Sequence, residues 1–157
     1  MGVNRSEAGF TLIELLVVVA VLGVVSVLAV PRMGDMVKEY KLRSACLGVV
    51  SSLQSLKLRA IKENARTVMI IDPVNDQYTT FVDNNPDNWS LDPPESRSVT
   101  VVRDEGLEIS STFASNTFGF NNRGLLATPF AGTITLTKDA TRSKTITLNS
   151  VGNIRVD

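Results

Sequence analysis

The first hydrophobic pattern along the chain is an apolar run over residues 10–30, in which Glu14 is the only charged side chain. Its length is close to the roughly 20 residues that span a bilayer. Three interpretations are open: a retained membrane helix, a secretory signal cleaved after Ala29, and a buried core helix. Glu14 favours the membrane helix, because a carboxylate in hydrocarbon is unfavourable unless it is functional and paired, and a plain signal gains nothing from it.

A second hydrophobic pattern follows Pro31, which lacks an N–H and is predicted to kink the helix. Apolar residues then recur at steps of three and four, the spacing of one helical face. These residues are Leu42, Ala45, Val49, Leu53, Leu56 and Ala60. We expect this face to pack on a sheet, with Cys46 beside it as an unreactive core thiol. The helix is predicted to end near Asn64, a residue tolerated in a left-handed cap.

Beyond Arg66 the hydrophobic period changes to two, which indicates β-strands with one buried and one solvated face. Segments 68–71 and 78–82 are predicted to form a hairpin around a turn at 72–76. Further strands are predicted at 98–103, 107–110, 117–120, 133–137, 145–148 and 154–156. The predicted fold class is α+β: a long N-terminal helix, apolar over 10–31 and amphipathic over 32–66, packed on an antiparallel sheet head over 67–157.

Composition and charge narrow the possible functions. The 157 residues allow one ordinary domain plus a hydrophobic segment. The chain has no histidine and one cysteine, so the commonest general base and the usual zinc ligands are missing. We therefore expect no enzyme, no cofactor and no metal. The formal net charge is zero, although residues 32–67 are net basic and residues 72–95 carry only acidic charges. These regions could attract each other within one molecule or between neighbours.

The hexapeptide Gly9-Phe10-Thr11-Leu12-Ile13-Glu14, with the apolar run behind it, resembles the processing site of type IV pilin-like proteins. The resemblance implies a leader over residues 1–9 that a prepilin peptidase removes between Gly9 and Phe10, followed by methylation of Phe10. It also implies that Glu14, the fifth residue of the mature chain, is required for assembly, and that Pro31 stands at the usual helix kink. We hypothesise that the Glu14 carboxylate pairs with the Phe10 ammonium of an adjacent subunit.

A further set of residues in the C-terminal part comprises Phe118-Gly119-Phe120-Asn121-Asn122-Arg123-Gly124, the strands at 133–137 and 145–148, and Val151-Gly152-Asn153-Ile154-Arg155. This pattern is similar to the GspH/FimT family of minor pilins and pseudopilins. The resemblance implies the pilin fold and a structural role in a type II secretion pseudopilus or a type IV pilus. The implied partners are prepilin peptidase, other pilins and inner-membrane lipid.

The resemblance also implies a location: a single pass through the inner membrane of a Gram-negative type of bacterium, with the head over 67–157 in the periplasm. The charge distribution argues against this orientation. The positive-inside rule places the flank with more Lys and Arg in the cytoplasm, and here the flank that follows residue 31 is the more basic one.

Two alternative functions stay open. In the first, the subunit takes up DNA, as in the competence-linked branch that this family resembles, through phosphate contacts. The candidate contact residues are Arg123, Arg142, Lys144 and Arg155. Against this, Asn153 stands where that branch tends to have arginine, and no set of aromatic residues for base stacking accompanies the basic ones. In the second, the chain is a secreted soluble binding domain released after Ala29.

The acidic segment after residue 82 raises the question of calcium. Residues 83–88 begin like a calcium loop, but Asn88 and Pro94 stand where an EF-hand requires Gly and Glu, so a solvated loop is favoured. Trp89 is expected to pack locally rather than to face a partner. Arg123 is expected to lie in a turn that follows two core phenylalanines, Phe118 and Phe120.

Overall fold

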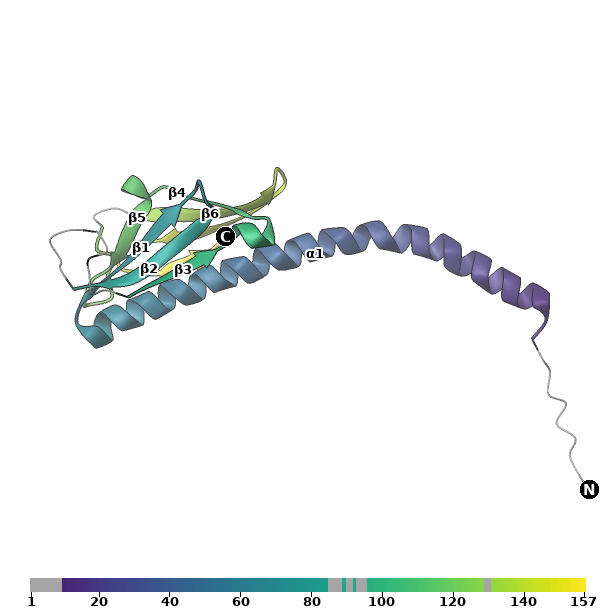
Figure 1. Cartoon of the computed structure of the whole chain (residues 1–157), viewed down its shortest axis with the longest axis horizontal. Helices are drawn as coiled ribbons and strands as arrows, with labels where there is room; N and C mark the ends of the chain where they lie inside the picture. The colour runs from purple at the N-terminus through teal and green to yellow at the C-terminus, as the bar shows by residue number, and fades with distance from the viewer. Residues whose placement is uncertain (1–9, 85–88, 90–91, 93–95, 129–130) are drawn as a thin grey trace, which may run out of the picture. The chain divides into compact units, whose positions relative to one another are not determined.

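The computed structural model describes residues 10–84, 89, 92, 96–128 and 131–157, except for the side chains of residues 27–33 and 104. The chain divides into two units, Met1–Val37 and Lys38–Asp157. One helix, α1 (Leu12–Glu63), contributes residues to both units (Figure 1).

Helix α1 ends where its sequence indicates. Its last residue is Glu63, and Asn64 adopts a left-handed conformation with φ +50°, which confirms the predicted cap. The N–H of Ala65 closes this end by donating to the carbonyl of Ala60 at 3.2 Å. The division of the chain at residue 66 stays a prediction. Pro31 lies within α1, which continues through it without interruption, and the predicted kink stays a prediction.

The first unit contains the N-terminal part of α1. Every side chain described from Phe10 to Ser26 is exposed, and apolar ones occur on all sides of the helix. Within the part of the chain that the structure describes, no helix meets the combined length and apolarity that crossing a membrane requires.

The second unit holds two four-stranded antiparallel sheets. The first sheet has the order β3-β2-β1-β5, with β1 at Arg66–Asp72, β2 at Gln77–Asp83, β3 at Arg97–Val101 and β5 at Thr117–Phe120. The second has the order β4-β6-β7-β8, with β4 at Glu108–Ser111, β6 at Gly132–Asp139, β7 at Arg142–Leu148 and β8 at Ile154–Val156. All the predicted strands are present, and the antiparallel head is confirmed.

One predicted strand is too long. The segment expected at 98–103 stops at Val101, because the chain turns into a short 3₁₀ helix, η1 (Arg103–Glu105), that ends at a left-handed Gly106. A second 3₁₀ helix, η2 (Ala114–Asn116), precedes β5. The β1–β2 hairpin forms around the predicted turn, where the Asp72 carboxylate accepts hydrogen bonds from the N–H groups of Val74 and Asn75 at 3.1 Å each.

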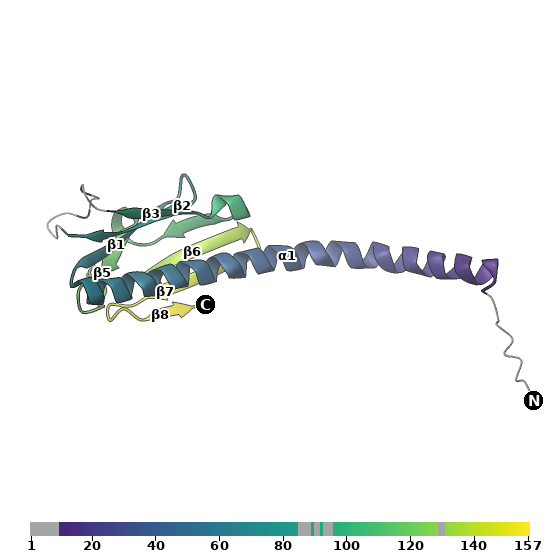
Figure 2. The same ribbon diagram turned by 60° about the horizontal axis from the view of Figure 1, so that its bottom comes forward.

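The core of the second unit lies between α1 and the two sheets (Figure 2). The predicted helical face supplies its residues from α1, and all but the partly buried Ala45 are fully buried. The strands supply Met69, Ile71, Ile134 and Ile146, among others. Phe118 and Phe120 are also fully buried, as predicted. The sequence periodicity therefore identified the face on which α1 packs.

Candidate assembly site and head surface

The start of α1 is closed by a reciprocal cap between Thr11 and Glu14. The Glu14 carboxylate accepts hydrogen bonds from the Thr11 N–H at 3.1 Å and from the Thr11 hydroxyl at 3.0 Å. In return, the Glu14 N–H donates to the Thr11 hydroxyl oxygen at 3.3 Å. This is the capping-box arrangement, in which a Thr at the N-cap and a Glu three residues later satisfy each other's backbone donors.

An apolar surface surrounds this polar pair. Glu14 borders a shallow cleft of about 300 Å³ whose other lining residues are Phe10, Ile13, Val17 and Val18. Phe10 is 85% exposed. The arrangement therefore presents one carboxylate at the edge of an uncovered apolar surface. Such a surface accepts lipid or another apolar helix, and the carboxylate adds one charged position to it.

The structure describes some of the predicted processing and assembly residues but not all of them. Gly9 lies outside the described residues, and Phe10 is the first residue described. Glu14 lies in the first turn of α1. No role was predicted for Thr11, although the spacing of a Thr and a Glu three residues apart before an apolar run is itself a signal for a capping box.

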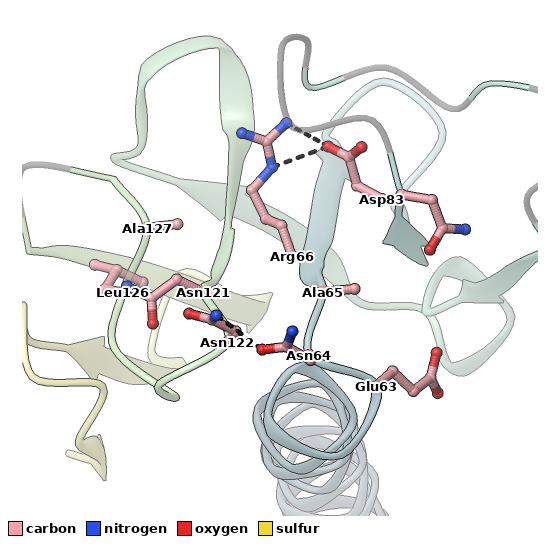
Figure 3. Close-up of a pocket in the computed structure, with 10 residues that line it drawn as sticks. Glu63, Asn64, Ala65, Arg66, Asp83, Asn121, Asn122, Leu126 and Ala127 are labelled. Carbon is pink, nitrogen blue, oxygen red and sulfur yellow. Dashed lines mark hydrogen bonds and ion pairs between the residues drawn. The ribbon is translucent and has the colours of Figure 1, made fainter.

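The polar centre of the head is an ion pair between Arg66 and Asp83, at the start of β1 and the end of β2 (Figure 3). The guanidinium Nε donates to the Asp83 carboxylate at 2.9 Å, and a terminal nitrogen donates to the same oxygen. The Asp83 side chain is fully buried. The ring of Trp89 covers the guanidinium, with its centroid 4.3 Å from the guanidinium carbon. Trp89 thus packs locally, as expected.

A cleft of about 640 Å³ opens beside this ion pair, at the C-terminal end of α1 (Figure 3). Four carboxamide side chains line it, those of Asn64, Asn84, Asn121 and Asn122. The Asn122 amide donates to the Asn64 side-chain oxygen at 2.9 Å. The Asn121 side-chain oxygen accepts hydrogen bonds from two backbone N–H groups of its own turn. The contact between Asn122 and Asn64 therefore holds the turn after β5 against the end of α1.

The calcium question depends on Asp83, the first oxygen donor of the proposed loop. Asp83 is buried in its ion pair with Arg66, which occupies the carboxylate with a guanidinium. Residues 85–88, which include the next donors, lie outside the described residues, as does Pro94. Among the residues that the structure does describe, no three acidic, histidine or cysteine side chains are grouped as a metal site would require.

The four basic residues considered for DNA do not share one surface. On β7 the buried side chains are Ile146 and Leu148, so Arg142 and Lys144 lie on the same face as these two. Arg155 of β8 is paired with Thr147 and therefore lies on the opposite face. Arg123 lies in the turn after β5, where its N–H donates to Asn121.

Two of these basic side chains also have acidic partners. Arg142 contacts Asp139 at 2.6 Å, and Arg155 contacts Asp157 at 2.8 Å. Each ion pair reduces the local positive charge that a phosphate would meet. The DNA-uptake alternative thus loses the continuous basic surface that it requires.

Cys46 is buried in the core, and it is the only cysteine of the chain. Burial raises the pKa of its thiol, while the nearby positive charge of Lys144 lowers it by a smaller amount. A buried thiol with a raised pKa is a poor nucleophile, which agrees with the structural role expected for this residue.

Comparison with known families gives two matches that together cover most of the chain. The family model described as "Type II transport protein GspH" matches residues 48–152, which is more than half of the chain. The chain belongs to the GspH family. The motif described as "Prokaryotic N-terminal methylation motif" matches residues 4–30 of this GspH-family protein. The resemblance drawn from the two sets of sequence motifs is confirmed.

The chain also resembles curated proteins in sequence. Two curated relatives, each named "Fimbrial protein" from Pseudomonas aeruginosa, are 35% identical over 77 residues. That match covers 47% of the GspH-family chain and 47% of each relative, so the chain spans about half the length of the curated relatives it matches.

Two solved structures share the fold. The type IV minor pilin FimU of Pseudomonas aeruginosa is similar with a TM-score of 0.62 and 15% identity, over 78% of this chain and 92% of FimU. The minor pseudopilin EpsH of the Vibrio cholerae type 2 secretion system is similar with a TM-score of 0.56 and 15% identity, over 74% of this chain and 95% of EpsH. The GspH-family protein therefore has the pilin fold.

Proposed function

We propose that this protein is a structural minor subunit of a type II secretion pseudopilus or a type IV pilus. In this proposal prepilin peptidase removes residues 1–9 by cutting between Gly9 and Phe10, and Phe10 is then methylated. The mature chain enters a filament by packing α1 against the helices of other pilins. It acts by assembly and carries out no reaction of its own.

The observation that carries this proposal is the combination at the start of α1. A helix with apolar side chains exposed on all sides needs apolar cover, either from lipid or from other helices. The methylation motif covers the same segment, and the GspH match covers the head. A single carboxylate in such a surface is explained if a partner supplies the opposite charge when the helices pack.

The cap makes a specific role for Glu14 physically reasonable. Before assembly, Glu14 lies in an apolar environment. Thr11 donates two hydrogen bonds to its carboxylate there, which reduces the free-energy cost of burying the charge. A protonated or methylated Phe10 amine of the adjacent subunit would add a full positive charge, which two neutral donors do not provide. The carboxylate would then fix the register of the incoming subunit.

We also propose a location and a division of the chain that follow from this role. Residues 10–31 serve as the membrane and assembly helix, and the inner membrane holds the subunit before assembly. Residues 32–66 connect to the head at 67–157, which lies in the periplasm. The partners are prepilin peptidase, other pilins or pseudopilins, and inner-membrane lipid.

The test uses the full chain expressed in a host that supplies the processing and assembly machinery. Glu14→Ala is expected to be processed but to be missing from the sheared filament fraction. Glu14→Gln separates the two roles of the side chain, because an amide oxygen can still accept from Thr11 but carries no charge. Glu39→Ala is the matched control, since Glu39 is an exposed glutamate elsewhere on α1. Filaments that contain Glu14→Ala at the level of the parent chain would overturn the proposal.

A further inference from the structure

The two sheets of the head have four edge strands, β3, β4, β5 and β8. The outer edges of three of them are protected against pairing with another strand, either by a covering segment or by charged side chains. The outer edge of β5 is covered by the segment that follows it. The Ala127 N–H donates to the Gly119 carbonyl at 2.8 Å, and Phe120 forms a bridge with Leu126. No strand from another protein can pair with β5 without displacing this segment.

The edges of β4 and β8 are blocked by charged side chains. On β4 the Ile109 N–H donates to the Asp76 carboxylate at 3.3 Å, so an acidic side chain stands where an added strand would run. Strand β8 has only three residues, and its central residue, Arg155, has an 80% exposed side chain that pairs with Asp157. Short edge strands with a charged centre resist pairing with other chains.

In the described part of the chain, strand β3 has none of these protections. All five of its residues are exposed, and its only charge, Arg97, stands at one end. Its centre is Ser98-Val99-Thr100, which contains no proline, and its pairing with β2 runs without a bulge. The outer edge of β3 has no backbone hydrogen-bond partner among the described residues. An open edge rich in β-branched residues is a template for another strand.

The two faces of β3 differ in polarity. Ser98 is paired with Thr80 and Thr100 with Tyr78, whose hydroxyl lies 3.0 Å from the Ser52 hydroxyl of α1, so Ser98 and Thr100 face the helix. Val99 and Val101 therefore lie on the face turned away from α1, where they are 45% and 42% exposed.

A groove of about 310 Å³ continues the helix-facing side of β3. Its lining is dominated by hydroxyl groups from α1, β2 and β3, namely those of Ser51, Ser52, Ser55, Thr80 and Ser98. Small hydroxyl side chains leave room for a neighbouring strand and can pair with its polar side chains. An added strand would meet hydroxyl groups on one face and valines on the other.

We propose that β3 is a strand-addition site, and that it accepts an extended segment from a different subunit of the same filament. The segment alternates small polar residues, directed at the serine-lined groove, with aliphatic residues beside Val99 and Val101. Main-chain hydrogen bonds along β3 supply affinity, and the alternation sets the register of the segment. This inference rests on the function proposed above, because it requires that the chain assemble with sister subunits.

Symmetry argues against a second copy of this chain as the occupant. Two β3 strands can pair antiparallel about a two-fold axis perpendicular to the sheet, with Val99 opposite Val99. Such an axis reverses every direction in the plane of the sheet, including that of the α1 segment packed on it. Two copies whose N-terminal segments enter the same membrane or filament core have α1 running in the same direction, so this pairing is excluded for them.

Hydrogen exchange on the full chain tests the proposal. The amides of residues 97–101 are compared between chains dispersed in detergent and chains in sheared filaments, with residues 154–156 of β8 as the internal reference. The β3 amides directed outward are expected to exchange roughly tenfold more slowly, or slower still, in the filament, because strand pairing protects them. The β8 amides are expected to exchange at the same rate in both states.

A pair of lysine substitutions gives the matched comparison. The double variant Val99→Lys with Val101→Lys is expected to lose the slow exchange at β3, because charges there oppose the aliphatic residues of the partner strand. Val156→Lys, which changes a valine 44% exposed on the β8 edge, is expected to keep it. If the double variant does not fold, the proposal is judged from the parent chain alone, by comparing the exchange rates of its β3 amides in detergent and in filaments.

Three results would overturn the proposal. Equal exchange at β3 in both states, with the parent chain present in filaments, would refute the strand addition and leave the proposed function intact. Slow exchange that appears when this chain alone is concentrated in detergent would identify a second copy as the occupant. A parent chain missing from filaments would refute the proposed function, and the strand-addition site with it.

Discussion

Thr11 and Glu14 satisfy each other's hydrogen-bonding groups at the first turn of α1 through three contacts of 3.0 to 3.3 Å. The pair explains how a carboxylate can stand at the start of an apolar helix. One carboxylate oxygen of Glu14 accepts both hydrogen bonds from Thr11, and the charge stays available to a partner. One side chain can therefore cap the helix before assembly and bind a cation during it.

The cap predicts a local effect of substituting Thr11. Thr11→Val removes the hydroxyl and is expected to destabilise the helix start by about 0.5–2 kcal/mol, because the Glu14 N–H loses its acceptor. The measurement is the exchange rate of the amides of residues 12–15 in detergent, which should rise. Thr11→Ser keeps the hydroxyl and should exchange like the parent. Equal rates in Thr11→Val and the parent would show that the cap does not stabilise α1.

The buried ion pair predicts a large difference between two Asp→Asn substitutions. Asp83→Asn removes the charge of the buried carboxylate that the Arg66 guanidinium contacts and is expected to destabilise the head by about 3–5 kcal/mol. Asp157→Asn breaks an exposed pair with Arg155 and should change stability by about 1 kcal/mol or less. Urea unfolding of both variants measures the difference. Similar midpoints would contradict the role assigned to Asp83.

Replacing Gly119 and Gly48 by alanine is expected to change the stability of the protein in opposite directions. A Cβ at Gly119 would lie 1.8 Å from the Thr67 carbonyl oxygen, so Gly119→Ala must push β5 away from β1. We expect it to destabilise the head by at least about 1–3 kcal/mol. A Cβ at Gly48 of α1 would meet no atom within 4 Å apart from its chain neighbours and the backbone of the helix itself, so Gly48→Ala should stabilise the helix by about 1 kcal/mol. Thermal unfolding distinguishes the two signs.

The contacts of Asp139 predict that part of the stability of the head depends on pH. Hydrogen bonds from Thr141, together with the Arg142 charge, lower the pKa of its carboxyl from 3.8 to about 2. Since the folded state lowers this pKa, the contribution to stability is fully present above about pH 4 and is lost as the pH falls towards 2. NMR titration of the carboxyl carbon should give a midpoint near 2. Thr141→Ala should move that midpoint back towards 3.8, and an unchanged midpoint would refute the assignment.

The sequence predicted the elements that depend on local pattern. Steps of three and four identified the buried face of α1, Asn64 identified its end, and alternation identified the strands. These features follow from the chemistry of neighbouring residues, which a single sequence displays directly. Strand β3 was drawn too long, because Val102 is apolar but becomes buried where the chain turns into η1.

Features that join distant segments could not be predicted in this way. Asp83 was considered as a calcium ligand, but the fold places it against Arg66, which lies 17 residues earlier in the chain. The carboxamide contact between Asn64 and Asn122 joins residues 58 positions apart. The sequence likewise could not predict that β3 is an edge strand, because strand order in a sheet depends on tertiary pairing rather than on local alternation.

The most direct test of the account is the N-terminal residue of the mature protein. The protein should be purified from the membrane of a host with prepilin peptidase, and its N-terminus determined by sequencing and intact mass. The account predicts a chain that begins with N-methylated Phe10. A mature chain that begins at Met1, or at Val30 after cleavage behind Ala29, would contradict it.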